Sequence, residues 1–165
     1  MKLITNLGGA DSPARTRAPE RGTFRVGAVQ TAWHPDAGEH RATLTAGVEL
    51  AARAGAQLVC LQELTLSPYF AIVPDGAEAL GVAAEPLPGG PTHAFAAELA
   101  ARFGLVVHAS LFEAAGEAEH PSVGAVPAGG GGFNTAIAVG PDGELLARTR
   151  KLHIPVTAGY YEDRY

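Results

Sequence analysis

Apolar and polar positions in the first part of the chain repeat with the periods of a strand, a helix and a second strand. Residues 24–30 alternate in a way that predicts a strand covered on both faces. Residues 38–54 carry an apolar stripe at helical spacing, and residues 58–61 form the short apolar run of a buried strand. In this expected helix, the apolar stripe consists of Leu44, Val48 and Ala51. Asp36 caps its start and Gly55 ends it. This order predicts a parallel strand pair joined by a right-handed crossover.

The second part of the chain predicts a further helix and three strands. The helix over residues 91–103 opens with proline and stops at Gly104, and residues 105–111 follow as an apolar strand. Residues 133–139 and 144–149 flank a Pro-Asp-Gly turn, which indicates a hairpin. A parallel pair combined with a hairpin makes a mixed sheet, so the predicted fold class is α/β.

Two segments lie outside these predicted elements. Residues 1–22 have no apolar period and predict a disordered N-terminal extension, so the expected domain covers residues 23–165. Residues 113–132 combine two prolines with six glycines and predict a long surface loop. The glycine run at 129–132 is not expected to bind phosphate, because neither Lys-Ser nor Lys-Thr follows it and the next element is a strand.

Composition restricts the class of protein. The chain is 47% apolar and 18% charged, which is typical of a globular domain, and its net charge of −5 argues against nucleic-acid binding. No apolar stretch reaches the roughly 18 residues that span a bilayer, and the N-terminus lacks the apolar core of a signal peptide. We therefore expect a cytoplasmic protein without membrane contact. The single cysteine and the spacing of the histidines predict no disulfide and no metal site.

Two charged residues follow strands at positions where α/β sheets bind ligands. Glu63 comes after a buried strand, in LVCLQELTLSPYF, where neighbouring leucines would desolvate its carboxylate and favour proton transfer. Lys151 comes after the last strand, in ARTRKLHIP, where an ammonium can stabilise a developing oxyanion. On position alone, the alternatives are a solvated carboxylate at the rim and a solvated lysine at a strand end.

Three other residues carry weaker signals. Cys60 lies inside the apolar strand, and its side chain is expected to point away from the face of Glu63. Because no neighbouring cation would lower its pKa, Cys60 is expected to be a small buried hydrophobic residue without a catalytic role. His153 has no adjacent nucleophile to activate and is expected to be structural. Glu162, in YYEDRY, has no local signal beyond a cluster of tyrosines and charges.

Three segments together resemble the nitrilase or carbon-nitrogen hydrolase superfamily, and most of all its N-carbamoylputrescine amidases. They are LVCLQELTLSPYF, FNTAIAVGPDGELLARTRKLHIP and GYYEDRY, and the resemblance spans residues 24–165. It implies an α-β-β-α sandwich and a Cys-Glu-Lys catalytic set that needs neither a metal nor another cofactor. By this resemblance Glu63 is the general base, Lys151 is the catalytic lysine and Glu162 is the second glutamate, which supports the lysine and the substrate.

The sequence departs from this family at the nucleophile. The family's cysteine lies beyond the lysine on a later strand, and no cysteine follows Lys151 here. The later strands and helices of the sandwich have no counterpart either. We therefore expect the N-terminal part of such a domain, inactive alone, whose complete form is a homo-oligomer.

Three functions remain open from the sequence. The first is hydrolysis of linear C–N bonds in amides or carbamoyl amines, with N-carbamoylputrescine converted to putrescine, CO2 and ammonia. The second is a non-catalytic remnant or partner-binding module, and the third is the glutamine-hydrolysing domain of a larger synthetase. The first function requires Glu63 and Lys151 to lie close together. We expect them to approach one another at the carboxyl end of the sheet, because both follow strands that should end there.

Overall fold

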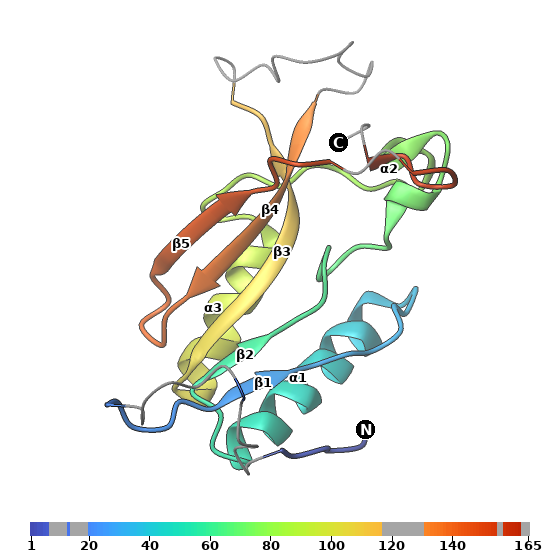
Figure 1. Cartoon of the computed structure of the whole chain (residues 1–165). Helices are drawn as coiled ribbons and strands as arrows, with labels where there is room; N and C mark the ends of the chain where they lie inside the picture. Colours follow the sequence, from blue (N-terminus) through green and yellow to red (C-terminus); the bar gives the residue numbers. More distant parts are fainter. Residues whose placement is uncertain (7–12, 14–19, 117–130, 155–156, 163–165) are drawn as a thin grey trace.

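A computed structural model describes residues 1–6, 13, 20–116, 131–154 and 157–162 (Figure 1). The extension predicted over residues 1–22 and the loop predicted over residues 113–132 lie mostly outside these described residues. Disorder of the extension and the domain boundary after it therefore stay predictions.

A mixed five-stranded sheet in the order β1-β2-β3-β4-β5 forms the centre of the fold (Figure 1). β1, β2 and β3 are parallel, and β3, β4 and β5 pair antiparallel. The α/β class, the parallel pair and the hairpin are thereby confirmed. The strands are β1 (Val26–Ala28), β2 (Leu58–Cys60), β3 (Val106–Ala114), β4 (Gly132–Val139) and β5 (Leu145–Arg150).

Two long helices pack against one face of the sheet. α1 (Ala37–Arg53) contacts β1 and β2, and α3 (Pro91–Phe103) contacts β3 and β4. The Asp36 carboxylate accepts a hydrogen bond from the backbone N–H of Glu39 at 2.8 Å, which caps α1. Gly104 ends α3 with a φ of 64°, a left-handed conformation that glycine adopts without strain. Both helices predicted from the sequence are confirmed.

The main core lies between these helices and the sheet. Leu44 and Val48 of the predicted helical stripe are completely buried there, and Ala51 is 8% exposed. A smaller cluster lies under the connection between β2 and α3, which carries the 3-10 turn η1 (Phe70–Ile72) and the short helix α2 (Gly76–Ala79). In it the Phe70 and Phe112 rings lie 5.1 Å apart, so this connection is attached to β3.

The first predicted strand is shorter and more exposed than expected. Only residues 26–28 form β1, and the side chains of Phe24 and Val26 are 58% and 60% exposed. The alternation in the sequence correctly places Val29 in the core, but an alternating pattern cannot tell whether a second layer covers the other face. β1 is an edge strand, and no described residue forms that second layer.

The loop predicted over residues 113–132 begins later in the structure than the sequence indicated. β3 continues to Ala114, and Glu113 is 2% exposed and pairs with Phe133 of β4. A charged residue interrupts the apolar pattern of the strand, but Arg148 and Arg150 neutralise it at 2.6 and 2.7 Å. Burial raises the pKa of Glu113, but hydrogen bonds from Arg150 and Thr135 and the charges of both arginines outweigh burial and lower it.

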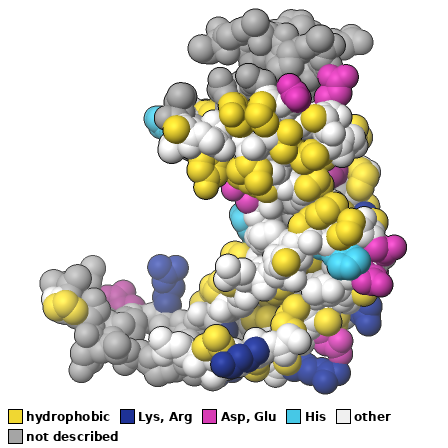
Figure 2. Space-filling model, turned by 90° about the vertical axis from the view of Figure 1, so that its right-hand side faces the viewer, with side chains coloured by type: hydrophobic (Ala, Val, Ile, Leu, Met, Phe, Trp, Pro, Cys, Tyr) yellow, Lys and Arg dark blue, Asp and Glu magenta, His cyan; other side chains and the backbone are white. Residues whose placement is uncertain are grey.

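The other face of the sheet has no helix over it among the described residues. Cys60 of β2, His108 of β3 and Ala136 of β4 lie on this open face and are half-buried. Figure 2 shows the molecule from the side of α1 and α2, with hydrophobic side chains gathered on the upper part and a hollow beside them. The candidate site lies at one end of this open face.

Candidate active site

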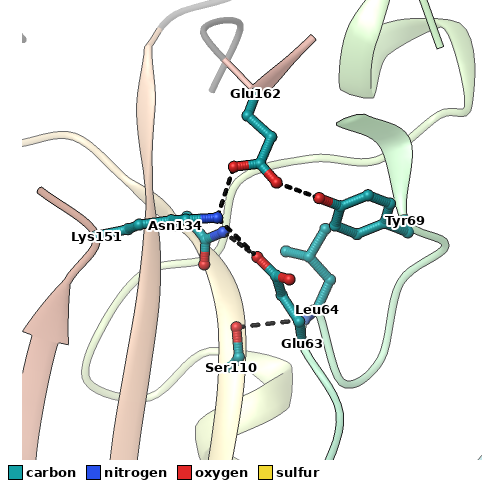
Figure 3. Close-up of polar contacts among 7 residues, drawn as sticks. All are labelled: Glu63, Leu64, Tyr69, Ser110, Asn134, Lys151 and Glu162. Atoms are coloured by element: carbon teal, nitrogen blue, oxygen red, sulfur yellow. Dashed lines mark hydrogen bonds and ion pairs between the residues drawn. The ribbon is translucent and has the colours of Figure 1, made fainter. Parts of the chain in front are cut away.

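The chain brings Glu63, Lys151 and Glu162 together at one end of the sheet (Figure 3). Glu63 follows β2 after two intervening residues, and Lys151 follows β5 directly. The backbone N–H of Lys151 donates to the carbonyl of Asn134 at 2.8 Å, which extends the β4–β5 ladder by one residue. Glu162 comes from the segment that follows β5 and reaches back to the same point.

The lysine ammonium lies between the two carboxylates. Lys151 Nζ is 2.5 Å from Glu162 Oε2 and 3.5 Å from Glu63 Oε1. The predicted approach of Glu63 and Lys151, which lie 88 residues apart in the sequence, is therefore confirmed. Their catalytic roles, and the supporting role of Glu162, stay predictions.

Two residues that the sequence analysis did not single out complete the site. The side-chain amide of Asn134 donates to Glu63 Oε1 at 2.5 Å, and the Tyr69 hydroxyl donates to Glu162 Oε1. Both lie inside segments that carry the family resemblance, Asn134 in FNTAIAV and Tyr69 in SPYF. The signal was therefore present in the motifs, but only the folded chain shows which charged group each residue contacts.

The segment after Glu63 is attached to β3 by three hydrogen bonds. Leu64 N–H donates to the Ser110 hydroxyl at 3.2 Å, and Thr65 and Ser110 exchange two further bonds at 2.9 and 3.0 Å. Leu64 is 1% exposed and has a φ of 50°, which is uncommon for a residue with a branched side chain. The backbone therefore bends at Glu63 and Leu64, after β2 has ended at Cys60.

A cavity of about 270 Å³ opens beside the charged groups. Its walls come from the open face of the sheet, and its lining residues are Glu63, His108, Ser110, Asn134, Ala136, Thr149 and Lys151. A carboxylate that can accept a proton and an ammonium that can stabilise an oxyanion thus line the same small space. A proton acceptor and an oxyanion stabiliser are two of the functions that nucleophilic catalysis at a carbonyl carbon uses.

The ionisation of Lys151 and Glu162 is coupled. Burial lowers the pKa of Lys151, but the hydrogen bond to Glu162 and the charges of Glu63 and Glu162 outweigh burial and raise it. Burial raises the pKa of Glu162, but the hydrogen bonds from Lys151 and Tyr69 and the lysine charge outweigh burial and lower it. The stabilisation from this pair is therefore lost in acid, as Glu162 protonates, and in alkali, as Lys151 deprotonates.

Replacing Glu162 with glutamine is expected to lower the pKa of Lys151, because the variant loses its closest negative charge. Lys2 is the other lysine in the sequence and is exposed, so it serves as an internal reference. Competitive acylation followed by mass spectrometry should show Lys151 of Glu162→Gln reacting faster, relative to Lys2, than in the parent chain. An unchanged ratio across the alkaline range would contradict the assigned contact.

Cys60 differs from the prediction in its burial and in the direction of its side chain. It is half-buried on β2 opposite His108, and His108 lines the same cavity as Glu63, so Cys60 does not point away from the face of the site. Counting alternate residues from Cys60 to Glu63 fails, because β2 ends at Cys60 and the backbone bends at Glu63 and Leu64. Burial raises the pKa of the Cys60 thiol, which disfavours the thiolate.

His153 lies outside the site. It is exposed, two residues beyond Lys151.

The structure also bears on metal binding and on membrane spans. Among the described residues, no group of three or more His, Cys, Asp or Glu side chains is arranged to bind a metal ion. No helix in the described part of the chain is both long and apolar enough to cross a membrane.

Comparison with known proteins places this arrangement in a family. Residues 25–165 match the carbon-nitrogen hydrolase family. An N-carbamoylputrescine amidase from Solanum lycopersicum is 34% identical over 140 residues, which are 85% of this chain and 42% of that protein. The chain thus spans less than half the length of this curated relative.

Solved structures show the same fold. A carbon-nitrogen hydrolase from Helicobacter pylori G27 superposes with a TM-score of 0.62 at 26% identity, covering 85% of this chain and 42% of that one. Nit3 from Saccharomyces cerevisiae, a member of branch 10 of the nitrilase superfamily, gives a TM-score of 0.60 at 22% identity, covering 79% and 44%. The sheet and its two helices therefore form an incomplete nitrilase-like domain. The chain belongs to the carbon-nitrogen hydrolase family.

Proposed function

We propose that this chain supplies the general base and the catalytic lysine of an enzyme that hydrolyses linear C–N bonds. The observation that carries the proposal is the position of Lys151 Nζ, 3.5 Å from Glu63 and 2.5 Å from Glu162, beside a cavity. An ammonium between two carboxylates remains charged, so it can stabilise an oxyanion throughout the reaction. Family membership supports the same chemistry.

The proposed reaction uses a cysteine thiol as nucleophile. Glu63 accepts the thiol proton, the thiolate attacks the ureido or amide carbon, and Lys151 stabilises the oxyanion of the tetrahedral intermediate. The C–N bond then breaks, and the proton held by Glu63 passes to the departing ammonia. Glu63 next takes a proton from water, which hydrolyses the thioester or thiocarbamate and releases the thiol.

The thiol is proposed to come from outside these 165 residues. Cys60 is the single cysteine in the sequence, it lies on β2, and its pKa is raised. A nucleophile needs the opposite, a neighbouring cation or base that favours the thiolate. We call any longer form or assembly that adds such a cysteine the nucleophile-bearing form.

N-carbamoylputrescine is the proposed substrate. Amidases of this name from Solanum lycopersicum and Solanum tuberosum are 34% and 33% identical to the chain over 140 residues. In the proposed reaction, loss of ammonia leaves a thiocarbamate, and its hydrolysis leaves a carbamic acid that decomposes to putrescine and CO2. One water is consumed for each ureido group cleaved.

Ammonia release from matched substrates tests this proposal. The nucleophile-bearing form is expected to release ammonia and putrescine from N-carbamoylputrescine with a higher kcat/KM than ammonia from glutamine or from a simple aliphatic amide. A preference for glutamine would instead favour the glutaminase domain of a synthetase. Absence of turnover on all three substrates would overturn the proposed function.

A further inference from the structure

Asn134 contacts both halves of the Glu63–Lys151 pair. Its side-chain Nδ2 donates to Glu63 Oε1 at 2.5 Å, and its backbone carbonyl accepts the Lys151 backbone N–H at 2.8 Å. It lies on β4, between β3 and β5, and its side chain is 7% exposed. One residue of β4 thus hydrogen-bonds two residues that are distant from each other in the sequence.

These contacts leave the two oxygens of Glu63 in different environments. A carboxylate only accepts hydrogen bonds, so the amide nitrogen of Asn134, not its oxygen, must face it. Oε1 receives both Asn134 and Lys151, at 2.5 and 3.5 Å. Oε2 has no hydrogen-bond partner among the described residues, so it is the oxygen free to take a proton.

Lys151 alone constrains Glu63 weakly. Its ammonium is 1.0 Å closer to Glu162 than to Glu63, from the distances of 2.5 and 3.5 Å, so Glu162 is its main partner. The Glu63 side chain is 41% exposed and follows a strand that has already ended. Without a second, short hydrogen bond, such a side chain gains rotamer freedom by turning to solvent.

We propose that Asn134 is the positioning residue for Glu63, fixing the carboxylate plane through Oε1 so that Oε2 faces the nucleophile and acts as the proton acceptor. This inference rests on the proposed role of Glu63 as general base. Asn134 takes no proton itself. It acts through a hydrogen bond that is present before the reaction starts, which is the preorganisation that general-base catalysis needs.

Two substitutions separate positioning from a purely structural role. In the nucleophile-bearing form, Asn134→Ala is expected to lower kcat about 10²-fold with little change in KM, because misplacing a reacting group by about 1 Å costs this much. Asn134→Asp places a second carboxylate against Glu63 and should lower kcat by a similar factor near neutral pH. As the pH falls, one proton shared between the two carboxyls restores a donor toward Glu63.

The pH profile is therefore the deciding kinetic result. Relative to the parent enzyme, Asn134→Asp is expected to recover activity on the acid side of the profile, whereas Asn134→Ala is not. Asn6 is the other asparagine in the sequence and is exposed, so Asn6→Asp and Asn6→Ala are matched controls with parent activity. Identical pH profiles for Asn134→Asp and Asn134→Ala would overturn the inference.

A second measurement on the 165-residue chain needs no activity. The charge of Glu63 helps to raise the pKa of Lys151, so a Glu63 carboxylate that turns to solvent leaves Lys151 more readily deprotonated. Asn134→Ala should increase acylation of Lys151 relative to Lys2, approaching the ratio measured for Glu63→Gln, while Asn6→Ala keeps the parent ratio. If Asn134→Ala keeps the Lys151-to-Lys2 acylation ratio of the parent chain, the positioning role is overturned. If the ratio increases but the nucleophile-bearing form shows no turnover, only the proposed function is overturned.

Discussion

Replacement of Glu63 with glutamine is expected to reduce turnover of N-carbamoylputrescine by the nucleophile-bearing form about 10²–10⁴-fold, the usual loss for a positioned general base. Glutamine keeps the shape of glutamate, and its carbonyl oxygen can still accept the hydrogen bonds that Asn134 and Lys151 donate to Oε1. The amide cannot accept the thiol proton. The loss should therefore appear in kcat, with an unchanged melting temperature.

The matched control is Glu98→Gln. Glu98 is exposed on α3, the helix that packs against the opposite face of the sheet from the cavity, and the substitution makes the same change in charge. It is expected to have parent activity. Near-normal ammonia release by Glu63→Gln would show that another group accepts the proton.

The 165-residue chain alone is expected to release no ammonia from carbamoyl amines or simple amides. Cys60 is its single thiol, burial raises the pKa of that thiol, and it lies within β2. A catalytic thiol must be able to ionise beside its base and reach the substrate carbon. The assay is ammonia release at protein concentrations high enough to detect a few turnovers per hour.

The Cys60→Ser variant is the control for this expectation, and it should be as inactive as the parent chain. Turnover by the parent that disappears in Cys60→Ser would identify Cys60 as the nucleophile. That outcome would overturn the proposal that the thiol comes from elsewhere, although the roles of Glu63 and Lys151 could stand.

The same chain is expected to associate in solution. β1 is an edge strand, Val26 is 60% exposed, and the open face of the sheet has no helix over it among the described residues. Exposed apolar faces and strand edges favour contacts between copies. Size-exclusion chromatography coupled to light scattering should show broad, concentration-dependent species. A sharp monomer peak at all concentrations would contradict this.

The elements that the sequence predicted well are those with strong local signals. The helix over residues 91–103 has the predicted bounds, because proline at its start and Gly104 at its end act within one turn of the helix. The hairpin of β4 and β5 follows from its Pro-Asp-Gly turn in the same way. The extent of β1 and the burial of Glu113 were missed, because both depend on what other segments place beside them.

The residues of the candidate site were also found partly from local sequence signals and partly from the tertiary structure. Sequence motifs alone identified Glu63, Lys151 and Glu162, because each lies in a segment that resembles the family. Only the tertiary structure showed that Asn134 and Tyr69 hydrogen-bond these carboxylates and that Cys60 shares the open face with His108. Residue types and motifs are local and can be read along the chain. The two hydrogen bonds join residues that lie 71 and 93 positions apart in the sequence, so they depend on how the strands pair and on the path of the segments that connect them. The direction of the Glu63 side chain depends on the bend of the backbone after β2.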